Sequence, residues 1–543
     1  MNKKYVMGAV VICAAAAGWF GMYTVEKTTE TAVADALSAV PAKAGEIKYS
    51  FLQNTLTLKG VEFDITDTTI TRKGRIDNVE VKGFNRKYVF SRSDAPYNPD
   101  TLPVVAESIT ATGISDTMTM NEVTMEQKVE KVQLTGWHQR LGTLLSLRRD
   151  HMGEASFFEE LYRCRIDGME ISNVTMKLSD PDISGVVFSV EKMALPEGVR
   201  APRGTDKVSP VTVSFSGIRF DAEKDIFGSL QKLELRDVLL PAPEVVAEFF
   251  QLSKKLNAVD GEELYGSEAD KLFTDLFLIM QKNYEKQVPV GRILLEKGSI
   301  SLRDDPEDEG AAPSVLTMDM KSFDYLMSMT EAGAFKNTTT LSGLKFAFPE
   351  SMEEADILNR YAPDGLVLNA KSESLTSDKE ASGKVRYELE GLGELEGDMA
   401  LEGDIRTFLD SITYEVDPGQ REALMNNLRM KSMNLTYRDS GLMAMSVEIA
   451  SRWNNCSIEE SMAFMESSLQ ELARMRERPL RELGNGLLEQ MAHPGEFRMT
   501  IAPEKPMNVM EAALVASLNP DALPVTFSSK PGTKALTDYL PKK

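Results

Sequence analysis

Cysteine and histidine are scarce in this chain, which has three of each among 543 residues. Three cysteines cannot supply the framework of disulfides that staples small secreted domains. The histidines do not stand at metal-ligand spacing from one another or from a cysteine. The short motifs of zinc proteases, serine hydrolases and phosphate-binding loops are absent as well. The sequence therefore predicts no catalytic residue, no metal site and no cofactor.

Basic residues are also in deficit, with 61 lysines and arginines against 83 acidic residues and a formal charge of −22. Such a charge repels phosphate backbones at long range, which excludes nucleic acid as an expected partner. An apolar content of 42% with 27% charged residues is that of a folded chain. The length allows two to four ordinary domains or one long repetitive structure.

The first 25 residues predict a membrane anchor. Residues 5–25 contain no charge and match the length of about 20 residues that a helix needs to cross a bilayer. Lys3 and Lys4 precede this segment, so residues 1–4 are expected in the cytoplasm and the rest of the chain in the periplasm. A cleaved signal peptide, with Ala15 and Ala17 at the cleavage site, is the alternative. We therefore expect a single-pass protein of the bacterial inner membrane.

A recurring break in strand periodicity is the most distinctive pattern. In "NTLTLKGVEFDI", apolar residues alternate, skip one position, and alternate again. The same spacing recurs in 169–178, 213–222, 233–242, 339–348 and 428–437, and shorter versions stand elsewhere. In the first stretch the apolar residues are Leu56, Leu58, Val61, Phe63 and Ile65.

Two structures fit this spacing. The residues at the break, such as Lys59 and Gly60, form a hairpin turn in one of them. In the other, a single long strand carries a β-bulge that resets the phase, so that both halves point to the same side. Turn-like sequences follow the second half of these stretches, which favours the bulged strand. Repeated bulges would curl a sheet into a trough.

Helical periodicity interrupts the strands at 139–163, 244–287 and 457–492, the last opened by a capping box of Ser457 and Glu460. The expected organisation is a mainly β chain with helical insertions (α+β), whose curled antiparallel sheets form a groove or layers. Its parts are a cytoplasmic stub 1–4, an anchor 5–25, a helical extension 26–42, a β-rich region 43–243, a helical insertion 244–287, a second β-rich region 288–456, a helical segment 457–492 and a closing region 493–543.

The opening of the chain resembles AsmA-type envelope proteins and their membrane-anchored periplasmic relatives. The similar segments are the anchor, "EKTTETAVADALSAV", "EIKYSFLQ", "NTLTLKGVEFDI" and "GRIDNVEVKGF". The end of the chain is similar to uncharacterised relatives of that kind in "MNLTYRDSGL", a long helix and "HPGEFRMTIAPEKPMNV". This resemblance implies curled β-sheets with an apolar groove, and a role in envelope maintenance or phospholipid movement. It carries over no catalytic residue.

The sequence thus leads to two hypotheses of function. The first is a non-enzymatic β-groove protein that binds or passes lipid-like molecules and supports envelope integrity. Its groove would be lined by Leu56, Leu58, Val61, Phe63, Ile65, Ile171, Val174, Met176, Phe215, Ile218, Phe220, Leu344, Phe346 and Leu435. The second is a structural or adaptor protein that binds another envelope protein through its helices, at Phe273, Phe277, Met280, Met465, Leu469 and Leu472.

Overall fold

The structure of the chain is a computed structural model. It describes residues 22–35, 37, 42–66, 70–87, 101–120, 123–140, 164–179, 185–199, 210–222, 225–239, 288–304, 314–408, 425 and 427–540. Most of the predicted anchor and of the helical insertions 139–163 and 244–287 lies outside these residues. In the part that is described, no helix combines the length and apolarity needed to cross a membrane.

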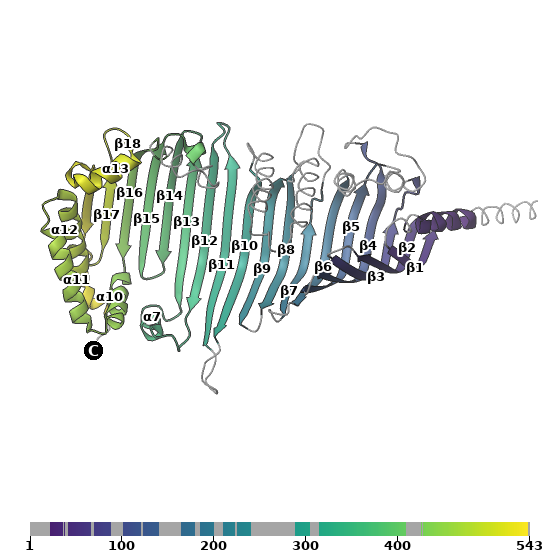
Figure 1. The fold of residues 1–543 in the computed structure, drawn as a ribbon, viewed down its shortest axis with the longest axis horizontal. Coiled ribbons are helices and arrows are strands. Elements are labelled where there is room, and N and C mark those ends of the chain that lie inside the picture. The colour runs from purple at the N-terminus through teal and green to yellow at the C-terminus, as the bar shows by residue number, and fades with distance from the viewer. Residues whose placement is uncertain are drawn as a thin grey trace, which may run out of the picture. The chain divides into compact units, whose positions relative to one another are not determined.

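The described residues form 19 strands, all in one antiparallel sheet (Figure 1). The prediction of a mainly β chain with repetitive antiparallel strands is therefore confirmed. The strands are β1 (Ala42–Ser50), β2 (Thr55–Thr66), β3 (Ile70–Lys82), β4 (Val104–Met120), β5 (Val123–His138), β6 (Arg165–Ser179), β7 (Val186–Leu195), β8 (Pro210–Ala222), β9 (Ile226–Leu239), β10 (Val290–Asp304), β11 (Ser314–Met329), β12 (Phe335–Ala347), β13 (Leu366–Thr376), β14 (Glu380–Leu389), β15 (Gly393–Glu402), β16 (Arg429–Asp439), β17 (Glu496–Ile501), β18 (Met507–Asn508) and β19 (Val525–Lys530).

Among the described residues, helices are fewer and lie mostly toward the C-terminus. An N-terminal helix covers residues 22–35. Further helices are α7 (Ala355–Tyr361), α10 (Leu442–Trp453), α11 (Ile458–Ala473), α12 (Arg478–Ala492) and α13 (Val509–Leu518). The predicted capping box is present, because the Ser457 hydroxyl accepts from the Glu460 backbone N–H and the Glu460 carboxylate accepts from the Ser457 backbone N–H.

Two compact units divide the chain. The first comprises residues 1–224 and 229–291, and the second comprises 225–228 and 292–543. We call them unit 1 and unit 2 and describe each by itself.

The break in periodicity is a phase slip that neighbouring strands share. In β2 and β3, Lys59 pairs with Asn78 and Val61 pairs with Ile76, so the register is the same before and after the break. Gly60, with φ of +55°, and the residue opposite it, Asp77, do not form a ladder pair. The two halves therefore belong to one strand, as predicted, and the hairpin alternative is wrong. The slip is not a bulge of two residues against one, because both strands skip a residue at the same level.

The slip continues through unit 1 at the same level of successive strands. Glycine or asparagine at positive φ alternates with an acidic residue at these positions. The opposed positions are Gly113 with Asp77 and Glu130, Asn173 with Glu130 and Glu191, and Gly217 with Glu191. A Cβ on Gly113 would lie 2.3 Å from the Asp77 carboxylate, so the missing side chain leaves room for the acid.

True bulges occur in unit 2. The slip of β10 and β11 continues into β12, but β13 alternates without a break, so the register between β12 and β13 shifts after Leu341. A second shift separates Ala400 from Leu401 in the pairing of β15 with β16. Here one strand does contain an extra residue, as the sequence pattern predicted.

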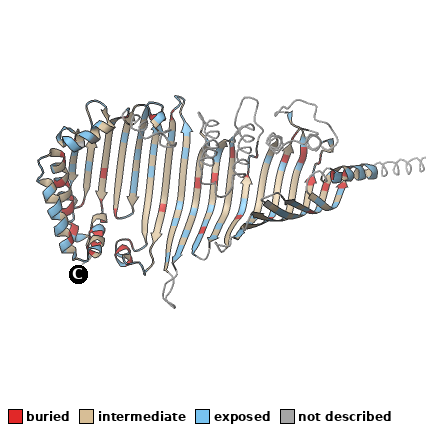
Figure 2. Ribbon diagram, viewed as in Figure 1, coloured by how far each residue is buried: buried red, intermediate tan, exposed pale blue. Residues whose placement is uncertain are grey.

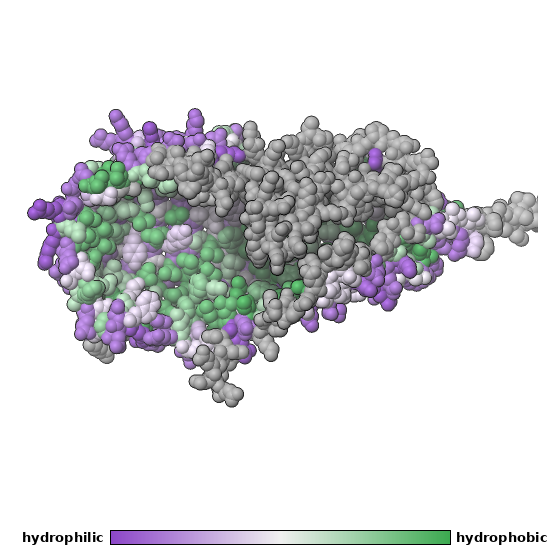
Figure 3. Space-filling model, viewed as in Figure 1, coloured by the Kyte–Doolittle hydropathy of each residue, from purple (hydrophilic) through white to green (hydrophobic). Residues whose placement is uncertain are grey.

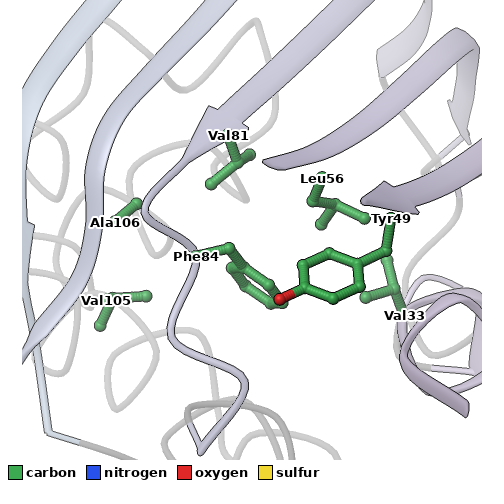
Figure 4. Packing of buried hydrophobic residues seen from close by; sticks show 7 residues of the cluster. All are labelled: Val33, Tyr49, Leu56, Val81, Phe84, Val105 and Ala106. Carbon is green, nitrogen blue, oxygen red and sulfur yellow. The ribbon is translucent and has the colours of Figure 1, made fainter. Parts of the chain in front are cut away.

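The best-buried cluster of unit 1 lies where the N-terminal helix meets the first strands (Figure 4). Val33 of the helix packs with Tyr49, Leu56 and Phe84, and the rings of Tyr49 and Phe84 meet edge to face at 6.3 Å. The Tyr49 hydroxyl donates to Asn54 Oδ1 at 2.9 Å, which satisfies the polar end of this ring. This cluster fixes the helix on the start of the sheet.

In unit 2 the helices cover one end of the sheet. Leu392, in the turn between β14 and β15, is buried together with Ile357 of α7 and Met445 of α10. This contact joins the turn to both helices. Helices α11 and α12 approach closely at Gly484, where a Cβ would lie 2.4 Å from the backbone nitrogen of Ala473. Most residues along β11 to β16, in contrast, are only half-buried (Figure 2).

Candidate functional site

In unit 1, one face of the sheet carries continuous apolar rows. Residues directly opposite each other on antiparallel strands share a face, so the register identifies these rows. One of them runs from β2 to β8 through Leu58, Val79, Ala111, Val132, Ile171, Met193 and Phe215. The next row, on the other side of the slip, runs through Val61, Ile76, Ile114, Val129, Val174, Val190 and Ile218.

The groove residues predicted in unit 1 occupy this face. Leu56 pairs with Val81 in the row above Leu58. Phe63 begins the row below Val61. This row of Phe63 continues across the strands to Met176 in β6 and Phe220 in β8. Ile65 stands one row further, at the register position of Arg72. Leu56 and Val61 stand on either side of the slip in β2 and are both buried, which indicates that the slip brings the two halves of this strand onto one apolar surface.

Unit 2 has an apolar face built in the same way. One row, from β11 to β17, consists of Phe323, Leu341, Ala370, Tyr387, Leu395, Tyr437 and Phe497. The predicted groove residues Leu344, Phe346 and Leu435 lie in neighbouring rows of the same face. Figure 3 shows hydrophobic residues gathered over these strands and hydrophilic residues along their margins.

Large side chains of this face remain partly exposed. Tyr387 is 45% exposed, Met399 43% and Met329 38%. In the described part of the chain, α10 and α12 pack only at the end of the face near Leu389 and Phe497. An apolar surface of this kind is a feature of binding sites rather than of closed cores.

The opposite face of unit 2 is charged. Arg438 bridges Glu394, Glu396 and Glu496 at 2.8 to 3.0 Å. The hydrogen bonds that the Arg438 guanidinium donates to Glu396 and then to Glu496 raise its pKa, and they lower the pKa of the Glu396 carboxyl. The two faces of the sheet therefore differ sharply in polarity.

A polar patch interrupts the apolar face of unit 1. In the row that begins at Phe63, the next three strands contribute Gly74, Asp116 and Gln127. Arg72, one row away, donates from Nε at 2.8 Å and from Nη2 at 2.7 Å to the same oxygen, Oδ2 of Asp116. The hydrogen bond with Asp116 raises the pKa of Arg72.

Phe63 organises this patch. Its ring occupies the space above Gly74, where a Cβ would lie 2.1 Å from the ring. The Arg72 guanidinium lies 5.8 Å from the centroid of the same ring, within the range of a cation–π contact. Asp116 is 4% exposed at its side chain, and its Oδ1 has no hydrogen-bond partner.

The patch borders a cavity of about 1260 Å³. Its lining includes Leu37 of the N-terminal region, Ile47 and Phe63 from the apolar rows, and Gly74, Asp116 and Gln127 from the patch. This volume exceeds the roughly 300 to 1,000 Å³ of ordinary small-molecule sites. Charged residues line it as well, among them Lys43, Glu62, Asp64, Lys73 and Arg75, so much of the cavity wall is polar.

Arg72 and Asp116 were not among the site residues predicted from the sequence. Their signal was a break in the apolar pattern: Asp116 stands two positions after Ile114, where the spacing calls for an apolar residue. Arg72 likewise stands where the pattern of β3 would continue beyond Ile76. Only the register brings these two exceptions together.

The predicted partner-binding residues of α11 face inward. Met465 and Leu469 pack against the cluster of Ala444, Val447, Met491 and Leu536, and Leu472 is half-buried. The exposed aromatic residues of these helices are instead Trp453 and Phe464, at 72% and 74%. The remaining candidates, Phe273, Phe277 and Met280, lie outside the described residues.

Chemistry of other kinds has little support in the described residues. They contain no group of three or more His, Cys, Asp or Glu side chains placed to hold a metal ion. Cys164 and Cys456 are free thiols. Burial raises the pKa of Cys164 to about 11, so this thiol is a poor nucleophile at neutral pH.

Comparison with protein families gives a partial match. Residues 386–530, which run from β14 to the end of β19, match the model of a family described as an uncharacterized protein. No curated protein matches the chain.

Proposed function

We propose that the chain is a non-enzymatic, membrane-anchored periplasmic protein that binds or passes lipid-like apolar molecules along a groove formed by its sheet, and thereby supports envelope integrity. The observation that carries the proposal is the continuous apolar face of unit 2, on which Tyr387 and Met399 stay more than 40% exposed. The predicted anchor of residues 5–25 would hold this face at the inner membrane. A relationship to AsmA-type proteins is part of the proposal.

Acyl chains fit such a face better than an extended polypeptide does. An extended segment brings backbone N–H and C=O groups that need hydrogen bonds, and rows of Val, Leu, Met and Phe provide none. An acyl chain has no such requirement and gains about 0.8 kcal/mol for each methylene that leaves water. The charged opposite face suits contact with solvent.

Analysis of bound lipid tests the proposal. The full-length chain would be extracted from cells into a detergent-free polymer disc, purified, and transferred to mild detergent that removes annular lipid. Co-purifying lipid would then be quantified by mass spectrometry. We expect lipid retained in defined molar proportion to the protein, and more of it than in a matched single-pass membrane protein. A chain that retains no more lipid than this control would contradict the proposal.

An adaptor function is the second candidate. Its support is the exposure of Trp453 and Phe464 on α10 and α11, since aromatic residues of this kind are enriched at protein interfaces. In-cell photocrosslinking from position 464 would test it. A single defined protein adduct is expected from the adaptor hypothesis, and its loss in a W453A variant would place the contact on these helices.

A further inference from the structure

The turn between β1 and β2 presents two large apolar side chains to the outside of unit 1. Phe51 is 40% exposed and Leu52 is 81% exposed. The turn is nevertheless firmly held, because the backbone C=O of Asn54 accepts from the N–H groups of Gly83 and Phe84 at 3.0 and 3.3 Å. A preordered apolar tip of this kind gains free energy when it is covered, and little of that gain is lost to ordering the turn.

The place of this turn indicates what covers it. The backbone N–H of Phe51 donates to Glu26 Oε1 at 2.8 Å. Glu26 is the first residue after the predicted anchor of residues 5–25, and it belongs to the N-terminal helix that packs on the first strands (Figure 1). The turn is therefore fixed at the level where the predicted anchor leaves the bilayer.

Basic residues and a further aromatic ring stand at the same place. The guanidinium of Arg86 lies 5.7 Å from the centroid of the Phe51 ring, and the exposed Lys87 follows it. On the helix, Lys27 Nζ lies 6.0 Å from the ring centroid of Tyr23, which is 49% exposed. Exposed aromatic rings beside basic side chains are typical of the interface between membrane and water, where the rings lie at headgroup level and the cations reach phosphate.

We propose that the turn of Phe51 and Leu52 is a membrane contact. The two side chains insert into the interfacial layer of the bilayer that holds the anchor, and Arg86 donates to lipid phosphate with the fixed fork of its guanidinium. The contact brings the first strands of the apolar face to the lipid surface. The inference rests on the proposed function, because it requires the anchor, and it adds the point at which the sheet meets the membrane.

Site-specific photocrosslinking to lipid tests the contact. The full-length chain with a benzophenone amino acid at position 52 would be reconstituted into vesicles of about three parts phosphatidylethanolamine to one part phosphatidylglycerol, so that anionic lipid is present. After irradiation, lipid adducts would be quantified by mass spectrometry of the peptide. The same amino acid at position 20, within the predicted anchor, reports on the anchor alone.

Position 197 is the matched control. Glu197 is exposed, in a turn of unit 1 where the Gly198 N–H donates to the Leu195 C=O at 3.0 Å. This turn lies at the same end of the strands as the turn after β1. We expect at least about fivefold more adduct at position 52, because five strand spacings separate β7 from β2, about 24 Å along the sheet.

The three positions separate the possible failures. Adducts at position 20, with no more at position 52 than at position 197, would overturn the membrane contact and leave the anchor of the proposed function standing. The absence of adducts at position 20 would overturn the anchor, and the contact with it. Substitution at an 81% exposed tip does not disturb the core, so misfolding does not obscure the result.

The assignment of Arg86 has its own test. A basic residue near an anionic surface strengthens binding, so R86Q should lower the adduct yield at position 52 by about two- to fivefold in the same vesicles. R219Q is the control, because Arg219 is 69% exposed in the same unit and pairs with Glu191 at 3.0 Å. R219Q should leave the yield unchanged. Equal yields in wild type and R86Q would overturn the role of Arg86.

Discussion

The backbone N–H of Gly343 donates a hydrogen bond of 2.7 Å to the side-chain Oδ1 of Asn369. Gly343, with φ of +58°, lies in the bulge of β12, opposite the strand that alternates without a break. The amide of Asn369 thus satisfies a donor that β13 does not reach with its backbone. The amide is itself held by Glu390, whose Oε1 accepts from Nδ2 at 2.9 Å.

Removal of this amide should destabilise unit 2. N369A leaves the N–H of Gly343, a buried residue, without its acceptor, and we expect a loss of about 1–3 kcal/mol in the free energy of unfolding. Urea denaturation followed by circular dichroism would measure it. K371A on the same strand is the control, because Lys371 is 55% exposed and its change should stay within about 0.5 kcal/mol. Equal effects of the two variants would count against the role of Asn369.

A side chain at residue 74 should displace Phe63. We expect G74A to destabilise unit 1 by about 1–2 kcal/mol, because the added Cβ meets the ring that stacks with Arg72. The cost should be smaller in an F63A background, where the ring is absent. A double-mutant cycle measured by denaturation should therefore show a coupling of at least about 0.5 kcal/mol. Strict additivity would show that the two residues do not interact.

A charge on the apolar face should weaken lipid binding without unfolding the chain. M399E places a carboxylate in the rows of unit 2, and we expect retained lipid to fall at least about fivefold. The control is L375E. Leu375 is also 43% exposed but pairs with Lys336, on the charged face. L375E should bind lipid as wild type does, and a similar loss in both variants would argue against a binding face.

The thiol of Cys164 should resist alkylation until strongly alkaline pH. Its pKa is raised from 9.0 to about 11, and the thiolate is the reactive form. Peptide mapping after a short pulse of iodoacetamide should show little labelling at pH 8 and a steep rise near pH 11. Because the unfolded chain ionises this thiol more readily, the stability of the fold should decline as pH rises above about 9. Labelling of the native protein at pH 8 as fast as in denaturant would contradict this prediction.

The spacing of apolar residues was enough to predict much of the fold. Leu56 and Val61 were expected on one face despite the odd number of steps between them, and both are buried, at 4% and 7% exposed. The sequence did not indicate that the slip is shared by adjacent strands. That property depends on which residue lies opposite Gly113, and this is fixed by pairing between segments far apart in the chain.

The polar patch was harder to find for a related reason. Polar residues are normal in strands with one solvated face, so Arg72 and Asp116 do not stand out until their face is known. Their separation of 44 positions in the sequence hides the ion pair as well. In α11 the apolar stripe of Met465 and Leu469 was recognised, but periodicity cannot distinguish an intramolecular contact from an external one.

The shared slip also constrains how the length of these strands can change. Deleting Gly113 would leave Asp77 on one side and Glu130 on the other without a counterpart, so the mismatch would appear in two pairings at once. The slip cannot end between two paired strands unless another group accommodates the extra residue. Beside β12, Asn369 does this. Insertions and deletions in this chain should therefore be tolerated in the connections and rejected at the level of the slip, unless several strands change together.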